Sequence, residues 1–370
     1  MKYILIVLML FSLNNLSAQQ EEQIMKSQVL NEDRLIQIGL PNSYTQEEND
    51  KYPLILLTDG EWHFDMIYEA SKLIYQNGGP KIIVVGINNT NRTRDLTSSN
   101  SPEDPSSGGA DDFLSYIETE LFPFLEKNYR ISNHRILLGH SAGGLFTTFA
   151  MVNKPDLFNA YVAVTPTIRW DNFKLLERFV DQTFRELSQS QVAFHMSIGN
   201  ETNDERKGVI KLDSIFSTIQ SKEITYSFTQ YLHLSHVTVP WNAYFDAMHT
   251  VYDKFFISED MLSSSLSDII SYYNDLGQFF DYDPKVPQRV LLNRGYELLK
   301  DENFEKALEN FEYYSIMYPN VPIPFSNLGD IYFQLSQFKQ AKKSYERAYE
   351  LFPTKYIELK IIEISKKGDF

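Results

Sequence analysis

The chain has 370 residues, of which 43% are hydrophobic and 14% aromatic, enough for two domains with substantial cores. Its formal net charge of −15 argues against a nucleic-acid or anionic-membrane partner, because both surfaces repel an acidic protein. The lack of cysteine excludes disulfide bonds, thiolate metal ligands and cysteine nucleophiles.

The N-terminal segment has the pattern of an export signal. Lys2 precedes an apolar run over residues 3–13, and Ser17 and Ala18 provide small residues before a cleavage point. The run is shorter than the roughly 17–25 apolar residues that a spanning helix needs. We expect residues 1–18 to be a signal peptide and the mature protein to be periplasmic or secreted, without a stable membrane span. Retention as an N-terminal anchor is the alternative.

Residues 20–280 alternate β-rich runs with helical patterns. Strands are predicted over residues 34–40, 52–58, 81–87, 134–139, 160–164, 192–198 and 226–232. Phe113, Ile117, Leu121 and Leu125 recur every four residues and predict a helix over 111–129. This alternation predicts an α/β domain with a mixed, mostly parallel sheet and helices on both faces.

A segment over residues 98–109 is rich in Ser, Asn, Pro and Gly. It predicts a surface loop, which is either a lid over a site or a plain connection.

A repeat follows a predicted linker over residues 281–287. Four positions of its first unit recur 34 residues later: Gly295 and Gly329, Ala307 and Ala341, Phe311 and Tyr345, Pro319 and Pro353. This is the period and pattern of tetratricopeptide repeats, so residues 288–368 are predicted to form a helical domain whose last helix caps the stack. Because two repeats are few for an independent solenoid, we expect them to dock on the first domain, on a second copy of the chain or on a protein partner.

The motif Gly139-His140-Ser141-Ala142-Gly143 lies between a predicted strand and a helical pattern. G-x-S-x-G in that context is typical of a nucleophile elbow, in which small neighbours allow a sharp turn that exposes the serine. Ser141 is therefore the candidate nucleophile, and a glycine-rich turn without chemistry is the alternative.

A serine nucleophile needs a base, and the base needs an orienting acid. His236 follows the predicted strand 226–232, at the end of a strand where a base is expected. His233 lies at the strand edge, and His249 lies in a helical pattern; both fit structural roles better. The remaining histidines precede the serine, adjoin it or lie within a strand: His63, His134, His140 and His195.

The orienting acid is expected after strand 192–198, where Glu201 comes first and Asp204 is the reserve. The oxyanion hole needs two backbone amides. Ala142 follows the nucleophile, and Gly60 is expected to allow a tight turn that presents the amide of Glu61 or a neighbour. No carboxylate motif accompanies His233 and His236, so no metal or other cofactor is expected.

Five ordered blocks carry a resemblance to a known family: YPLILLTDGEWHF, VVGINNTNRTRDLT, GGADDFLSYIETELFPFLEKNYRI, RILLGHSAGGLF and SHVTVP. Over about residues 24–260 the chain resembles the Putative esterase family, which includes esterase D and the enterochelin and ferric-siderophore esterases. The resemblance implies an α/β-hydrolase fold, carboxylic ester hydrolysis, and Ser141 and His236 as nucleophile and base.

The resemblance also implies that the block from Arg92 to Asp95 lies near the site mouth. Arg92, Arg94, Trp62 and His140 are candidate substrate-binding residues, although the two arginines could instead pair with Asp95 and nearby carboxylates. Family members act on siderophore lactones, aryl esters, acyl-sugar esters and thioesters, so a small-molecule ester is the expected substrate. A catalytically silent scaffold that acts through its repeats, or an acyltransferase with the same residues, are the alternatives.

Overall fold

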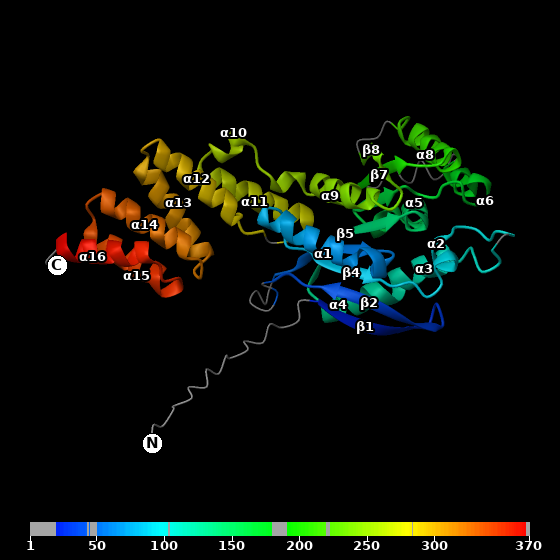
Figure 1. Ribbon diagram of the computed structural model, residues 1–370, viewed down its shortest axis with the longest axis horizontal. Coiled ribbons are helices and arrows are strands. Elements are labelled where there is room, and N and C mark those ends of the chain that lie inside the picture. The colour runs from blue at the N-terminus through cyan, green and yellow to red at the C-terminus, as the bar shows by residue number, and fades with distance from the viewer. Residues whose placement is uncertain are drawn as a thin grey trace, which may run out of the picture.

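An eight-stranded sheet is the centre of the first domain (Figure 1). The computed structural model describes residues 20–42, 44, 50–102, 104–179, 191–219, 223–282 and 284–367, so the predicted signal peptide lies outside the described residues. The strands are β1 (Gln20–Ser27), β2 (Glu32–Gly39), β3 (Tyr52–Leu57), β4 (Ile83–Ile87), β5 (Ile131–His140), β6 (Ala160–Val164), β7 (Val192–Asn200) and β8 (Ile224–Ser235). Their order is β1-β2-β4-β3-β5-β6-β7-β8.

Strands β4, β3, β5, β6, β7 and β8 run parallel, whereas β1 and β2 form an antiparallel edge. Each predicted strand is present, with ends shifted by a few residues. The sequence analysis did not identify β1, whose side chains alternate between exposed and half-buried because only one face packs on the domain. The predicted mixed, mostly parallel α/β sheet is confirmed.

Helices cover both faces of the sheet. The helices of the first domain are α1 (Gly60–Gln76), α2 (Arg92–Leu96), α3 (Ala110–Tyr116), α4 (Phe122–Asn128), α5 (Ala142–Asn153), α6 (Trp170–Phe173), α8 (Asn203–Phe216), α9 (Val239–Val251), α10 (Glu259–Leu262) and α11 (Leu266–Phe280). Neighbouring residues of a strand point to opposite faces. Leu56 accordingly packs in one core with side chains of α3, α5 and α8, and Ile55 packs in the other with side chains of α1, α9 and α11.

The predicted helix over residues 111–129 is present. It consists of α3, a π-helical turn (Ile117–Leu121) and α4 in direct succession. Phe113, Ile117, Leu121 and Leu125 are all buried, as their spacing requires. One helix face therefore supplies part of the core that lies under the sheet on the α5 side.

The predicted loop over residues 98–109 folds back on itself. The Asn100 side chain donates hydrogen bonds to the carbonyl oxygens of Pro105 (3.0 Å) and Ser107 (3.1 Å). Trp170 Nε1 donates to the Ser99 carbonyl at 3.0 Å and fixes the base of the loop. These hydrogen bonds hold the loop against itself and against Trp170. Its function as a lid stays a prediction.

The C-terminal part is an array of five helices that extends away from the sheet (Figure 1). They are α12 (Gln288–Lys300), α13 (Phe304–Met317), α14 (Pro322–Gln334), α15 (Phe338–Leu351) and α16 (Lys355–Lys367). A Cβ on Gly295 would lie 2.4 Å from the Phe311 ring, and one on Gly329 would lie 2.7 Å from the Tyr345 ring. The repeated glycines therefore allow each helix pair to cross closely, which explains the predicted repeat pattern.

The first repeat packs on the first domain. Val290 and Leu291 of α12 belong to the same core as Ile74 of α1 and Phe280 of α11. Arg289 also donates a hydrogen bond to the side chain of Asn77, at the end of α1. Docking of the repeats on the first domain, one of the three expected arrangements, is thus present within one chain.

His134 of β5 allows a test of this core by pH. Its ring is 4% exposed and packs 4.6 Å from the Phe280 ring, between centroids. Burial lowers the pKa of His134 from 6.5 to about 3, so the unfolded chain binds a proton that the folded protein does not.

We therefore predict that the folded state loses stability as the pH falls below about 6.5. Relative to His134→Phe, the wild-type free energy of unfolding should fall by about 1.4 kcal/mol per pH unit between pH 6.5 and 4. Above pH 7 the difference between the two proteins should be constant. Urea unfolding at several pH values measures this, and identical pH dependence in both proteins would contradict a buried neutral His134.

Candidate active site

Ser141 occupies a strained turn between β5 and α5. Its backbone has φ 60° and ψ −116°, a conformation that is costly for a residue with a side chain. A Cβ on Gly139 would lie 2.1 Å from the Gly143 carbonyl oxygen, and one on Gly143 would lie 2.3 Å from Thr58 Oγ1. Only glycine at both positions lets β5, α5 and the loop after β3 meet, so the motif spacing has a steric cause.

Thr167 lies beside the candidate nucleophile and was not identified from the sequence. Its Oγ1 lies 3.3 Å from Ser141 Oγ, and its amide donates to the Ser141 carbonyl at 3.1 Å. Thr167 follows β6, the neighbour of β5, so residues after the carboxyl ends of adjacent parallel strands were the available signal.

His236 and Glu201 form a hydrogen-bonded pair. His236 Nδ1 lies 3.0 Å and 3.1 Å from the two carboxylate oxygens of Glu201. The Glu201 side chain is 5% exposed and that of His236 is 37% exposed. The pair forms because β7 and β8 are parallel neighbours whose ends, Asn200 and Ser235, lie in register. A carboxylate at Nδ1 leaves Nε2 available as a base.

Asp204, the reserve for the acid, lies exposed in the first turn of α8. Glu201 is thus the carboxylate that contacts His236. No hydrogen bond joins Ser141 to His236 among the described residues. His140, which directly precedes Ser141, has its ring 4.6 Å from that of His236. Catalytic hydrogen bonds are often loose without substrate, so this geometry is compatible with a Ser–His–Glu triad.

Two helix N-termini meet at the nucleophile. β3 and β5 are parallel neighbours, and Thr58 N donates to the Leu138 carbonyl at 3.1 Å. Therefore α1, which starts after β3, and α5, which starts after β5, begin side by side. Ala142 and Glu61 lie in the first turns of these helices, where amides lack intrahelical acceptors. This placement allows both amides to donate to a developing oxyanion.

The tight turn before α1 is formed by Asp59, and the expectation that Gly60 forms it was wrong. Asp59 has φ 57° in the left-handed region, whereas Gly60 already belongs to the helix. Gly60 is required for a different reason, because a Cβ there would lie 2.9 Å from the Gly86 carbonyl carbon.

Asp59 is fully buried and binds Arg92. Arg92 Nε donates to Asp59 Oδ1 at 2.6 Å, and Nη2 donates to Oδ2 at 2.9 Å. Asn89 Nδ2 adds a third hydrogen bond at 2.7 Å. Arg92 Nη2 also reaches the His140 carbonyl at 3.3 Å, and the guanidinium lies over the Trp62 ring at 5.1 Å. Arg92 thus lies near the site, but its charge is neutralised by the ion pair with Asp59.

The other candidate binding residues differ in position. Arg94 forms ion pairs with Glu32 (2.8 Å) and Asp95 (2.7 Å). These contacts agree with the alternative in which the arginine pairs with Asp95 and nearby carboxylates. The Trp62 side chain is 62% exposed at the start of α1 and is available to a ligand. His140 is buried against His236, where it can position the base.

Two further imidazole rings pack in series beside His236. Burial lowers the pKa of His140 to about 3 and also lowers the pKa of His63. The His63 ring lies 5.6 Å from that of His140 and 5.7 Å from that of Tyr244. The sequence analysis excluded His63 as the base because it precedes Ser141 in the chain. Chain order does not show which residues lie next to the base in space. Two uncharged rings provide a wall that adds no positive charge beside the base.

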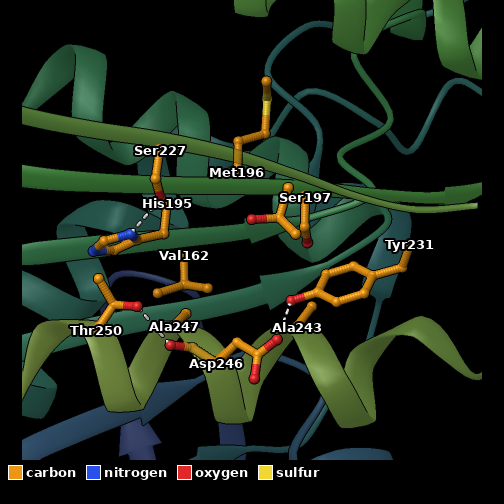
Figure 2. Close-up of a pocket in the computed structure, with 11 residues that line it drawn as sticks. Val162, His195, Met196, Ser197, Ser227, Tyr231, Ala243, Asp246, Ala247 and Thr250 are labelled. Carbon is orange, nitrogen blue, oxygen red and sulfur yellow. Dashed lines mark hydrogen bonds between the residues drawn. The ribbon is translucent and has the colours of Figure 1, made fainter.

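A second Ser–His pair lies elsewhere in the sheet (Figure 2). His195 Nδ1 is 2.7 Å from Ser227 Oγ, and Tyr231 donates to Asp246 at 2.5 Å. These groups line a polar cavity of about 40 Å³ between the sheet and α9, which has room for one or two water molecules. Ser227 lies within β8, where the backbone amides form the sheet, and the pair therefore has no helix N-terminus to bind an oxyanion.

Metal ligation finds no support in the part of the chain that the structure describes. No group of three or more His, Cys, Asp or Glu residues there has the geometry of a metal site. His233, the proposed partner of His236 in that alternative, lies exposed on β8. Within the described residues there is also no helix long and apolar enough to cross a membrane.

Comparison with known proteins gives two family matches. A family model described as Putative esterase matches residues 27–256, and one described as Tetratricopeptide repeat matches residues 323–355. The first match covers more than half of the chain. The second lies within the repeat region and spans α14 and α15.

Two curated relatives align with part of the chain. The ferri-bacillibactin esterase BesA of Bacillus subtilis is 32% identical over 178 residues, which cover 41% of this chain and 62% of that protein. The siderophore enterobactin esterase of Emericella nidulans is 33% identical over 126 residues, which cover 32% of this chain and 41% of that protein. Both alignments span less than two thirds of the relative.

A solved structure shares the fold. The IroE-like serine hydrolase from Shewanella oneidensis has a TM-score of 0.67 and 24% sequence identity, and the match covers 80% of this chain and 98% of that chain. At this identity the likeness concerns the fold alone.

The Asp59–Arg92 pair predicts a stability effect. Arg92→Met should lower the free energy of unfolding by roughly 2 to 4 kcal/mol, because it leaves the buried Asp59 carboxylate with Asn89 as its remaining side-chain donor. Arg206→Met is the control, since Arg206 bonds to the neutral Gln230 side chain. Urea denaturation of both variants measures the difference. Equal stability of Arg92→Met and wild type would show that Arg92 is not needed to neutralise Asp59.

Proposed function

Because the chain belongs to the Putative esterase family, we propose that it hydrolyses a carboxylic ester through an acyl-enzyme on Ser141. The observation that carries the proposal is the His236–Glu201 pair at 3.0 Å beside a serine in a strained strand-to-helix turn. A base with its orienting acid and a serine at a nucleophile elbow are the parts that acyl transfer requires.

The proposed reaction has two steps. Ser141 Oγ attacks the ester carbonyl carbon while His236 Nε2 takes the hydroxyl proton, and the amides of Ala142 and Glu61 bind the oxyanion. His236 then gives the proton to the leaving alcohol, which leaves an acyl-serine. Water, activated by His236, attacks the acyl-serine and releases the carboxylic acid. Glu201 holds the His236 tautomer and stabilises the imidazolium throughout.

The substrate proposal is a siderophore-type ester, because both curated relatives named above are siderophore esterases. An acyl-sugar ester is the second candidate. Acyl transfer to another acceptor uses the same residues and differs in its product. Export of the mature protein is also part of the proposal and depends on the pattern of residues 1–18 alone.

The nucleophile is tested by hydrolysis of p-nitrophenyl acetate. Ser141→Ala should lower kcat/KM by at least about 10⁴-fold, because the covalent step is lost. Ser214→Ala, at an exposed serine of α8, should retain wild-type activity. Circular dichroism establishes that both variants fold. Wild-type turnover that persists in Ser141→Ala would sink the assignment, and no turnover in wild type on any ester would favour the silent scaffold.

The acid is tested by a pair of amide substitutions. Glu201→Gln keeps the shape of the side chain but favours the wrong His236 tautomer, so kcat should fall by about 10³- to 10⁴-fold. Asp204→Asn, which alters an exposed carboxylate in the first turn of α8, should stay within about twofold of wild type. Steady-state kinetics measures both. Equal effects of the two substitutions, or a larger effect at Asp204, would exclude Glu201 as the acid.

A further inference from the structure

Helices α1 and α9 both begin at the edge of the sheet that carries the candidate site. α1 starts after β3 with Asp59 and Gly60, and α9 starts four residues after β8, just beyond His236. The two helices lie in contact on the same face of the sheet (Figure 1). The first turns of both helices therefore lie near the candidate catalytic residues.

A groove between these two helices is largely apolar. Its volume is about 420 Å³, within the range of small-molecule sites. The lining consists of Asp65, Met66, Ile67, Glu69, Ala70 and Leu73 from α1, and Trp241, Tyr244 and Phe245 from α9. Three aromatic rings and four aliphatic or thioether side chains thus face two carboxylates.

Exposed apolar side chains lie between the catalytic base and this groove along the sequence. Val237, which directly follows His236, is 77% exposed, and Trp241 one turn further is 66% exposed. On α1, Trp62 is 62% exposed and Leu73 is 54% exposed, and the i, i+4, i+11 spacing through Met66 puts them on one helix face. Soluble monomers rarely expose several large apolar side chains together, and such patches are typical of binding sites.

The inner wall of the groove also touches the site. Tyr244 lines the groove and is buried. Its ring lies 5.7 Å from that of His63. His63 in turn contacts His140, which contacts His236. A row of four rings therefore leads from Tyr244 in the groove wall to His236.

The charges around the groove disfavour an anionic ligand. The described lining contains two carboxylates and no cation, although Lys72 pairs with Glu69 at 2.6 Å. The nearby Arg92 is bound to Asp59. An uncharged apolar group is the ligand chemistry that matches this lining.

We propose that the groove between α1 and α9 receives an uncharged apolar arm on the alcohol side of the ester, a proposal that rests on the function proposed above. The alcohol side is assigned because His236 protonates the leaving alcohol, which must therefore lie next to His236. From His236 the apolar arm of the substrate passes Val237 and then Trp241, which lines the groove. The part of the ester that enters the groove is then uncharged and apolar, whatever groups the rest of the substrate carries.

The test uses acetate esters of ethanol, butanol and hexanol, with release of acetic acid followed by pH-stat. In wild type, kcat/KM should rise roughly three- to fourfold per added methylene, which is the factor that burial of one methylene provides. Trp241→Ala should reduce the hexyl-to-ethyl ratio of kcat/KM by about tenfold, because it removes one wall of the groove.

Leu73→Glu has a matched control in Leu359→Glu. Leu73 is 54% exposed in the groove, and Leu359 is 53% exposed on α16 in the C-terminal array. Leu73→Glu should lower the hexyl-to-ethyl ratio, whereas Leu359→Glu should leave it unchanged.

A flat wild-type profile on the alcohol side, or equal ratios in all variants, would overturn the groove assignment while leaving the esterase proposal standing. Dependence on the length of the acyl chain instead, measured with p-nitrophenyl acetate, butyrate and hexanoate, would also overturn it. If wild type hydrolyses none of these esters, the proposed esterase function itself fails. That outcome is distinguishable from a flat alcohol-length profile, which contradicts the groove assignment alone.

Discussion

The close approach of β5, α5 and the loop after β3 determines the rest of the site. Gly139 and Gly143 have room for no Cβ, and this contact holds Ser141 at φ 60° with its half-buried side chain at the end of the sheet. The same contact brings the first turn of α1 against the first turn of α5, so amides from two helices surround one point. It also buries the Asp59 carboxylate, and the protein neutralises that charge with Arg92 and Asn89. Strain and buried charge at this point are thus compensated by the surrounding structure.

The order of the parallel strands assembles the remaining groups. β5, β6, β7 and β8 are consecutive neighbours, and each ends at the same edge with one residue of the site: Ser141, Thr167, Glu201 and His236. Neutral His140 and His63 pack behind the base, with their pKa values lowered by burial. Tyr244 of the groove between α1 and α9 contacts the His63 ring. Nucleophile and base therefore lie at one edge of the sheet, and the groove lies on the adjoining helical face.

Local patterns predicted most of the fold. Buried parallel strands leave continuous apolar runs, the elbow needs glycines at fixed positions, and the repeats keep a 34-residue offset, so each was identified without tertiary information. β1 was missed because an edge strand with one packed face has a weak apolar pattern. Asp59, Thr167 and His63 were missed because their roles depend on which strands are neighbours. Arg92 and Arg94 could not be assigned from sequence, since their carboxylate partners Asp59 and Glu32 lie far away in the chain.

The most direct test is labelling with a fluorophosphonate, which reacts covalently with an activated serine hydroxyl. The folded protein is treated, digested with trypsin and mapped by mass spectrometry. The proposed site predicts one stoichiometric adduct, on Ser141, and none after denaturation, because the reactivity depends on His236 and the elbow. No adduct in the folded protein, or an adduct on another serine such as Ser227, would contradict a nucleophile at Ser141.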